Sequence, residues 1–282
     1  MARGKYVGIL ESDDFMAPDA LEKLVAAAER FDADFAKANF DLYWSKPEER
    51  RELMELFKAK DCGKPVHPSA TVDAFSLKPS IWSAVYRRDF LNRNAIRFLP
   101  TPGAAFQDAS FTFKVFALAD TAVYLHDSVL SYRQDNEGSS VNSPNKVHCV
   151  NDEYAEIHRW IVEDYAETHS SLDVAKLLRF ANIIKYDSYM WSYIRLNPKF
   201  YAEFLDRMAQ EFRGALEVHE FELTDLKPWK RANLKAIVND PQKWLTESED
   251  FAGAGALGRA RHYARIGGPG VVAAFVLDAI KK

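Results

Sequence analysis

An acidic turn follows the first apolar run of the chain. Residues 6–10 read YVGIL, and Glu11, Ser12, Asp13 and Asp14 come directly after them. Carboxylates crowded at the end of a strand repel one another unless a positive charge lies among them. Their hard oxygen atoms suit Mg²⁺ or Mn²⁺, and such a cation in turn binds a diphosphate. The alternative is a solvated turn before a helix, with Asp14 near the positive end of the helix dipole.

Strand and helix patterns alternate over the first 142 residues, which is typical of an α/β sheet. The patterns predict strands over 6–10, 34–43, 81–86 and 121–133, and helices from residue 17, within 48–60 and over 107–119. The first strand has the composition of a buried parallel strand, which requires a neighbour on each side. Ligands bind such sheets at the carboxyl ends of the strands, where the acidic turn lies.

The second half of the sequence predicts helices alone. They are expected to start at Ser143-Pro144, at a cap on Asp173, at Pro198 and after the break at residues 267–270. A stripe of Tyr186, Tyr189 and Tyr193 at helical spacing predicts packing between helices. We therefore expect two domains, residues 1–142 and 143–282, with a loop at residues 138–140 beside the boundary.

Composition excludes several classes of protein. The 282 residues include 37 basic and 41 acidic side chains, a net charge of -4, so no basic field favours nucleic acid. Cys62 and Cys149 form neither a zinc ribbon nor a disulfide framework. No apolar run reaches the ~18 residues of a membrane span and the start is no signal peptide, so a cytoplasmic location is expected. The last helix, followed by Lys281-Lys282, could lie on the inner face of a membrane or pack on the other helices.

Residues 4–40 resemble the middle of a family 2 glycosyltransferase with the GT-A fold. They contain a strand, the acidic turn, "PDALEKL" and an "AD" strand in the order typical of that family. "PSIWSAVYRRDFLNRNAIRF" resembles its acceptor-side segment. "FQDASFTFKVFALAD" resembles its "ED" helix, and "LHDSVLSYRQDNEGSS" its closing strand. Together these segments extend to about residue 141 and keep the spacing of the family.

This resemblance implies a GT-A-like mixed or parallel sheet, truncated at its N-terminus, followed by an α-helical region. It also implies an inverting, metal-dependent, hexosyltransferase-like enzyme that uses Mn²⁺ or Mg²⁺. The donor would be a nucleotide-diphosphate sugar and the acceptor a saccharide or a lipid-linked saccharide in cell-surface polysaccharide synthesis. Self-association and peripheral contact with a membrane stay open.

The resemblance also assigns roles on the donor side. Glu11 and Asp13 match the DxD carboxylates, so Asp13 would contact the metal, and Glu11 would reach the ribose or the metal through water. Asp14 belongs to the same turn. Arg133 could approach the donor phosphates or have a structural role.

On the acceptor side, Asp108 matches the general base, which takes the proton from the attacking hydroxyl. Gln107 stands where the family has a second carboxylate. Trp82 could stack on a sugar face or belong to the core.

Some features depart from the family pattern. Glu11 is longer than the usual aspartate, and Gln107 is neutral. The opening strands and the "DDGS" turn of the family have no counterpart in the printed sequence, which suggests a fragment, a mis-assigned start or a degenerate protein with an exposed sheet edge. The alternative function is therefore a non-catalytic remnant whose helical half binds a partner. A nucleotidyltransferase is disfavoured because no glycine-rich phosphate loop is present.

Overall fold

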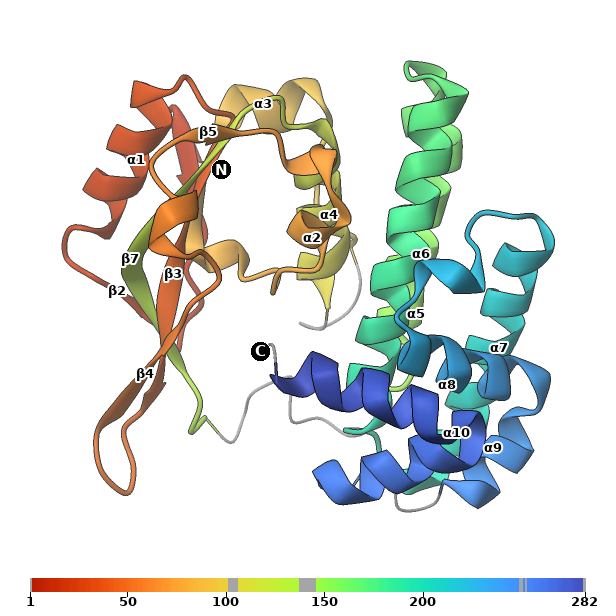
Figure 1. Ribbon diagram of the computed structural model, residues 1–282. Coiled ribbons are helices and arrows are strands. Elements are labelled where there is room, and N and C mark those ends of the chain that lie inside the picture. Colours follow the sequence, from red (N-terminus) through yellow and green to blue (C-terminus); the bar gives the residue numbers. More distant parts are fainter. Residues whose placement is uncertain (1, 101–105, 137–145, 249–250, 252, 281–282) are drawn as a thin grey trace. The chain divides into compact units, whose positions relative to one another are not determined.

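The computed structural model describes the chain except residues 1, 101–105, 137–145, 249–250, 252 and 281–282 (Figure 1). The chain forms two compact units, Met1–Ser140 and Val141–Lys282, and each is described by itself. The loop expected at residues 138–140 and the helix start expected at Ser143-Pro144 lie outside the described residues.

The first unit is built on a mixed sheet of seven strands. Five of them run in the order β1-β6-β3-β7-β2, while β4 pairs with β3 and β5 pairs with β7. Among the described pairs, β3 and β7 are parallel and the others are antiparallel. The strands are β1 (Tyr6–Gly8), β2 (Phe15–Met16), β3 (Phe35–Trp44), β4 (Arg50–Met54), β5 (Pro65–Val66), β6 (Ala84–Arg87) and β7 (Ala122–Arg133).

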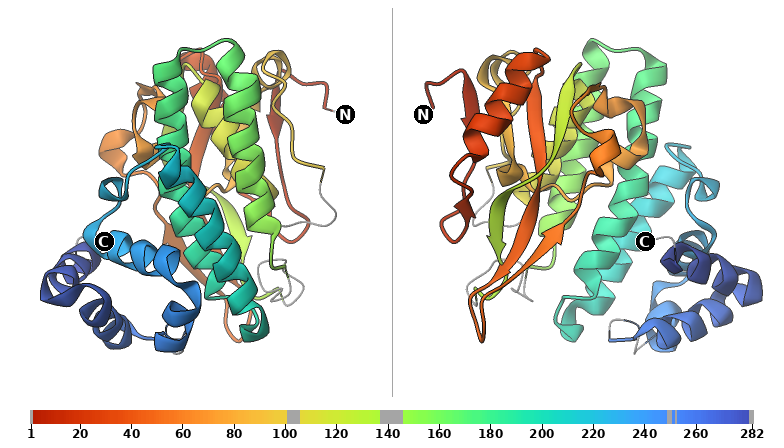
Figure 2. Two further views of the ribbon diagram at one scale, coloured as in Figure 1. Left: turned by 90° about the vertical axis from the view of Figure 1, so that its right-hand side faces the viewer. Right: turned by 60° about the vertical axis from the view of Figure 1, so that its left-hand side comes forward.

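Helices cover both faces of this sheet (Figures 1 and 2). On one face α1 (Ala20–Arg30) buries Leu24 and Ala28 and contacts β3, β6 and β7. On the other face Phe116 of α4 (Gln107–Leu118) stacks on Phe35 of β3, with ring centroids 5.4 Å apart. The short helices α2 (Val72–Phe75) and α3 (Arg88–Arg93) complete the unit. Because β3 is buried between these layers, its first six residues are fully enclosed.

The expectations for residues 48–60 and for the first strand are wrong. Residues 50–54 form β4 rather than a helix, because pairing with β3 and the position of Arg50 over the Trp44 ring, 3.8 Å from its centroid, outweigh the helix propensity of this segment. In the described sheet β1 is an edge strand that pairs antiparallel with β6, not a buried parallel strand. A short apolar run did not distinguish these environments, since Gly8 and Leu10 are both exposed.

The second unit is helical, as expected. Its helices are α5 (Cys149–Arg159), α6 (Ser171–Tyr193), α7 (Tyr201–Glu217), α8 (Pro228–Asn239), α9 (Pro241–Glu247) and α10 (Ala256–Ile280). Tyr186, Tyr189 and Tyr193 are buried in its core, so the prediction of helix packing is confirmed. The N-cap of α6 is Ser170, not Asp173; the Ser170 side chain accepts the Asp173 N–H at 3.2 Å.

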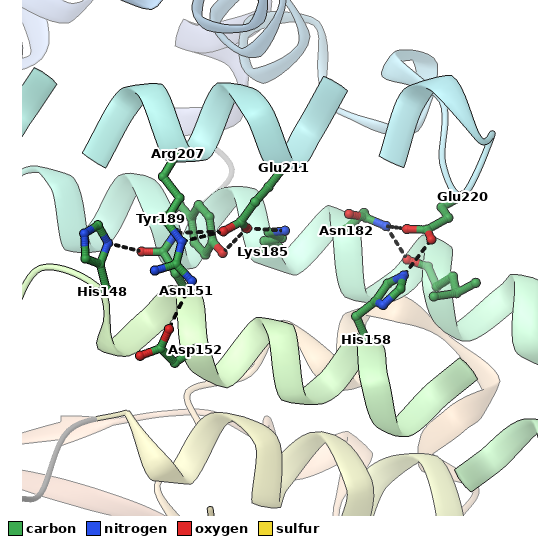
Figure 3. Close-up of polar contacts among 11 residues, drawn as sticks. His148, Asn151, Asp152, His158, Asn182, Lys185, Tyr189, Arg207, Glu211 and Glu220 are labelled. Carbon is green, nitrogen blue, oxygen red and sulfur yellow. Dashed lines mark hydrogen bonds and ion pairs between the residues drawn. The ribbon is translucent and has the colours of Figure 1, made fainter. Parts of the chain in front are cut away.

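Charged side chains join α5, α6 and α7 inside this unit (Figure 3). The Glu211 carboxylate accepts from Lys185 Nζ at 2.6 Å, from the Tyr189 hydroxyl at 2.6 Å and from Arg207 Nε at 3.0 Å. A second carboxylate, Glu220, lies 2.7 Å from His158 Nε2. Because partly buried charges need partners, these contacts stabilise the packing of α6 against α7 and of α5 against the turn that follows α7.

Candidate functional site

The acidic turn crosses the sheet from one edge to the other. Gly8 at the end of β1 is level with Ala36 of β3, since both pair with Val85. Phe15 at the start of β2 is level with Asp41, because both pair with Ser131. Residues 9–14 therefore connect the two edge strands, from the level of Ala36 to that of Asp41.

The carboxyl groups of Glu11, Asp13 and Asp14 converge in this turn. One oxygen of each lies within 4.8 Å of the others. Glu11 is exposed, Asp13 is half-buried and Asp14 is buried. A cation could therefore enter this group from the solvent side, at Glu11, and bind the buried carboxylate of Asp14.

The end of β7 holds the turn in place. The Arg133 main-chain N–H donates to Asp14 Oδ1 at 2.9 Å, and Arg133 Nε donates to the Asp13 carbonyl at 3.1 Å. The Asn136 amide donates to Asp13 Oδ2 at 2.7 Å. Asp14 Oδ2 is buried and has no hydrogen-bond partner. The two carboxylates are thus oriented by a main-chain N–H and a side-chain amide, while the Arg133 guanidinium binds the main chain of the turn.

Two carboxyl groups of the turn, those of Asp14 and Glu11, have raised pKa values. Burial raises the pKa of Asp14 to about 6. The hydrogen bond from the Arg133 N–H opposes this rise, and the charge of Asp13 adds to it. Partial burial also raises the pKa of Glu11, and the charges of Asp14, Asp13 and Asp108 raise it further. A bound cation would relieve this repulsion.

Asp108 shares the electrostatic environment of the turn although it lies about a hundred residues further along the chain. It is in the first turn of α4, where the helix N-terminus favours a negative charge. Burial nevertheless raises the pKa of Asp108, opposed by its own N–H and by the charges of Lys78 and Lys37. A carboxylate with a raised pKa beside a group of acids has the properties that a general base requires.

Lys37 is a buried cation that the sequence reading did not select. Its ammonium donates to the Pro79 carbonyl at 2.9 Å and to the Ser80 carbonyl at 2.6 Å. Ser80 has a φ of 22°, so these bonds hold a strained turn in place. Burial lowers the pKa of Lys37 to about 7, while the charge of Asp108 opposes that fall. A lysine inside the apolar strand FAKANF was the signal that could have revealed it.

Lys78 and Tyr132 complete the site. Lys78 Nζ lies 4.5 Å from the centroid of the Tyr132 ring, and its charge lowers the pKa of Glu11, Asp14 and Asp108. Burial raises the pKa of Tyr132 to about 12, and the charges of the same three carboxylates and of Asp13 add to this rise. The charges of all four acids therefore act on the pKa of the Tyr132 hydroxyl. Its place at the end of a strand gave no sign of this from the sequence.

Other residues named from the sequence have structural partners. Trp82 is 4% exposed and stacks on Tyr132 at 4.8 Å, which corresponds to the core alternative. The Gln107 amide donates to the Leu99 carbonyl at 3.3 Å. Arg133 also donates to Ser45 Oγ at 3.0 Å and pairs with Asp135 at 3.5 Å. In the structure Glu11, Asp13 and Asp14 thus converge, and the charge of Asp108 raises the pKa of Glu11. Trp82 packs on the Tyr132 ring.

Known proteins resemble the chain in sequence and in fold. The curated glycosyltransferase YibD of Escherichia coli (strain K12), described as uncharacterized, is 28% identical over 143 residues, which cover 50% of this chain and 41% of that protein. The chain therefore spans less than half the length of this relative. S. aureus TarS 1-349 in complex with UDP-GlcNAc superposes with a TM-score of 0.62 at 16% identity, covering 89% of this chain and 69% of that one. The complex of TarS 1-349 with UDP superposes with a TM-score of 0.60 at 17% identity, covering 89% of this chain and 68% of that one.

These similarities agree with the fold expected from the sequence. TarS shares the fold, and the sheet with its helical second unit matches the GT-A-like architecture expected from the sequence. Residues 1–107, which include the acidic turn, match the family model described as Glycosyl transferase family 2.

Proposed function

We propose that this chain transfers a sugar from a nucleotide-diphosphate donor to an acceptor hydroxyl, with inversion at the anomeric carbon. One observation carries the proposal: the acidic turn and Asp108 share one electrostatic environment although they come from distant segments. TarS 1-349 binds UDP-GlcNAc in one of the similar structures and UDP in another, which supports a uridine-diphosphate sugar as the first donor to test.

The residues of the turn fit a divalent cation. Converging carboxylate oxygens are the ligands that Mg²⁺ and Mn²⁺ prefer, and the unpartnered Asp14 Oδ2 is a buried acceptor that a cation would satisfy. Asp13, Asp14 and Glu11 would hold it. A bound cation would supply Lewis-acid stabilisation of the departing diphosphate. Arg133 and Asn136 orient the turn for this task, because both donate hydrogen bonds to Asp13.

Asp108 is the general base in this proposal. It accepts the proton of the acceptor hydroxyl while that oxygen attacks the anomeric carbon. Lys37 and Lys78 adjust its basicity, since both cations lower the pKa that burial raises. A base with its pKa raised towards the working pH accepts a proton more readily than an ordinary aspartate. The developing positive charge on the sugar resembles an oxocarbenium ion.

The acceptor and the cellular role follow from the family alone. We propose a saccharide or a lipid-linked saccharide as acceptor, in the synthesis of a cell-surface polysaccharide, and a cytoplasmic location.

A non-catalytic remnant is the second candidate. The amide at Gln107, where the family resemblance implies a carboxylate, favours it, because that amide donates to the Leu99 carbonyl and brings no charge to Asp108. In that case the helical unit would bind a partner, and the acidic turn would bind no nucleotide.

Calorimetric titration with UDP, in the presence and in the absence of Mn²⁺, tests the proposal. We expect Mn²⁺-dependent binding, and Asp13→Ala should abolish the dependence on the metal. Glu22→Ala is the matched control, because Glu22 is an exposed acid of α1 outside the turn. Absence of UDP binding by the folded chain would favour the remnant, and binding unchanged in Asp13→Ala would place the metal elsewhere.

A further inference from the structure

The last helix of the chain, α10, is the one described helix whose length and composition would allow it to cross a membrane. Its backbone breaks at Gly268, where φ is 73° and ψ is -172°. This conformation is open to glycine alone, and Pro269 then begins a new helical segment. Residues 256–267 and 269–280 are therefore two short helices of about 18 Å each, too short for a hydrocarbon layer of ~30 Å.

The second segment presents its apolar side to solvent. Ala273, Val276, Leu277 and Ile280 stand at the i, i+3, i+4, i+7 positions of one stripe, and all are exposed. Leu277 is 60% exposed and Ile280 is 75% exposed. Isolated apolar side chains are ordinary on a surface, whereas a continuous stripe without a polar residue requires an explanation.

The opposite side of this segment packs on the protein. Phe275 lies against Tyr263 at 4.8 Å and Trp229 at 5.7 Å. Asp278, the one acid of residues 256–282, pairs with Lys227 just before α8. Figure 2 shows the segments of α10 beside α8. The helix is thus inverted relative to an ordinary surface helix, since its carboxylate faces the protein and its apolar stripe faces outwards.

Basic residues precede and follow the stripe in the sequence. Arg259, Arg261 and Arg265 are exposed on the first segment, and Lys281 and Lys282 follow the second in the sequence. These 27 residues thus carry five basic side chains and one acid, in a chain whose net charge is -4. Neutralisation of that acid by Lys227 leaves the end of the chain strongly cationic.

We propose that α10 binds the surface of an anionic phospholipid bilayer. The stripe of Ala273, Val276, Leu277 and Ile280 enters the boundary between headgroups and acyl chains, and the exposed arginines of the first segment contact lipid phosphates. Apolar insertion combined with positive charge is the combination that such surfaces select. The segment lies in the interface without crossing it, because the break at Gly268 limits each helix to about 18 Å.

Flotation of the full chain with vesicles tests this inference. We expect it to float with phosphatidylcholine vesicles that contain about 30% phosphatidylglycerol and not with phosphatidylcholine alone, and about 1 M salt should release it. The double variant Leu277→Glu with Ile280→Glu should reduce partition by at least about tenfold. Arg261→Glu should weaken it by several-fold. Leu172→Glu is the matched control, because Leu172 is an 82% exposed leucine at the start of α6.

Other outcomes would overturn the inference. Failure to bind anionic vesicles at low salt would do so, as would binding that the double variant leaves unchanged or that high salt cannot reverse. Sedimentation velocity tests whether a second copy of the chain covers the stripe instead. A dimer that the double variant dissociates, in a protein that does not bind vesicles, would show this. These readouts do not depend on sugar transfer.

Discussion

Arg133 and Asp14 are 119 positions apart, and the main-chain N–H of Arg133 donates to Asp14 Oδ1 at 2.9 Å. This bond ties the acidic turn to the end of β7. It occupies one oxygen of the carboxylate and leaves Oδ2 buried without a partner. The sheet therefore fixes the direction of Asp14 without neutralising its charge, which is the state that a cation-binding carboxylate requires.

Binding of Mn²⁺ should depend on the ionisation of Asp14. Burial raises its pKa to about 6, so the free protein holds this carboxyl protonated below that pH and ionised above it. A metal must then displace a proton, and Mn²⁺ affinity should fall about tenfold between about pH 7 and about pH 5. Calorimetry at several pH values measures this. Asp14→Asn should bind Mn²⁺ more weakly with a flatter pH dependence, and an equally steep fall in that variant would assign the proton to another group.

Asp108→Asn should separate chemistry from binding. The amide keeps the size of the side chain but cannot accept the hydroxyl proton, so the rate of transfer should fall by about 10²- to 10⁴-fold while UDP affinity changes little. Release of UDP from the donor measures the rate. Asp73→Asn is the matched control, because Asp73 is an exposed acid in the first turn of α2. Transfer at a near-normal rate in Asp108→Asn would refute the base assignment.

Trp82 should act through packing. It stacks on Tyr132 and lies edge-on to Phe40 at 4.5 Å. Trp82→Ala should therefore lower the free energy of unfolding by about 3–5 kcal/mol, measured by urea denaturation. Trp44→Ala is the comparison, because Trp44 is only half-buried at the end of β3 and should cost less. If Trp82→Phe unfolds like the wild type but loses acceptor-dependent turnover, the indole contacts the sugar instead.

The sequence predicted long elements better than short ones. The patterns of β3, β7 and α4 were clear because each is ten or more residues long and has a buried face. β4 was missed because its residues favour a helix locally, whereas in the structure they form a strand by pairing with β3. The acidic turn was visible as a local motif. Lys37 and Tyr132 were not selected, since their importance comes from burial beside carboxylates that are distant in sequence.

His262 should make the helical unit sensitive to acid. It is 4% exposed, and Asn233 fixes its tautomer: the Asn233 amide donates to the Tyr186 hydroxyl, so Asn233 Oδ1 must accept from His262 Nε2, at 2.8 Å. His262 Nδ1 then accepts from Ser248 Oγ at 3.0 Å. Burial, with the nearby charge of Arg265, lowers the pKa of His262 to about 4.

The direction of the pH effect follows from this lowered pKa. Between about pH 6.5 and about pH 4 the unfolded chain binds a proton at His262 and the folded chain does not. Lowering the pH through this range should therefore lower the free energy of unfolding by up to about 3 kcal/mol. Urea denaturation followed by circular dichroism measures it, and His262→Gln should flatten this dependence. His158 supplies the opposite control: its bond to Glu220 raises its pKa, so its stabilisation is present at low pH and is lost as pH rises. His158→Gln should therefore steepen the acid sensitivity, and an unchanged slope in His262→Gln would show that another group titrates.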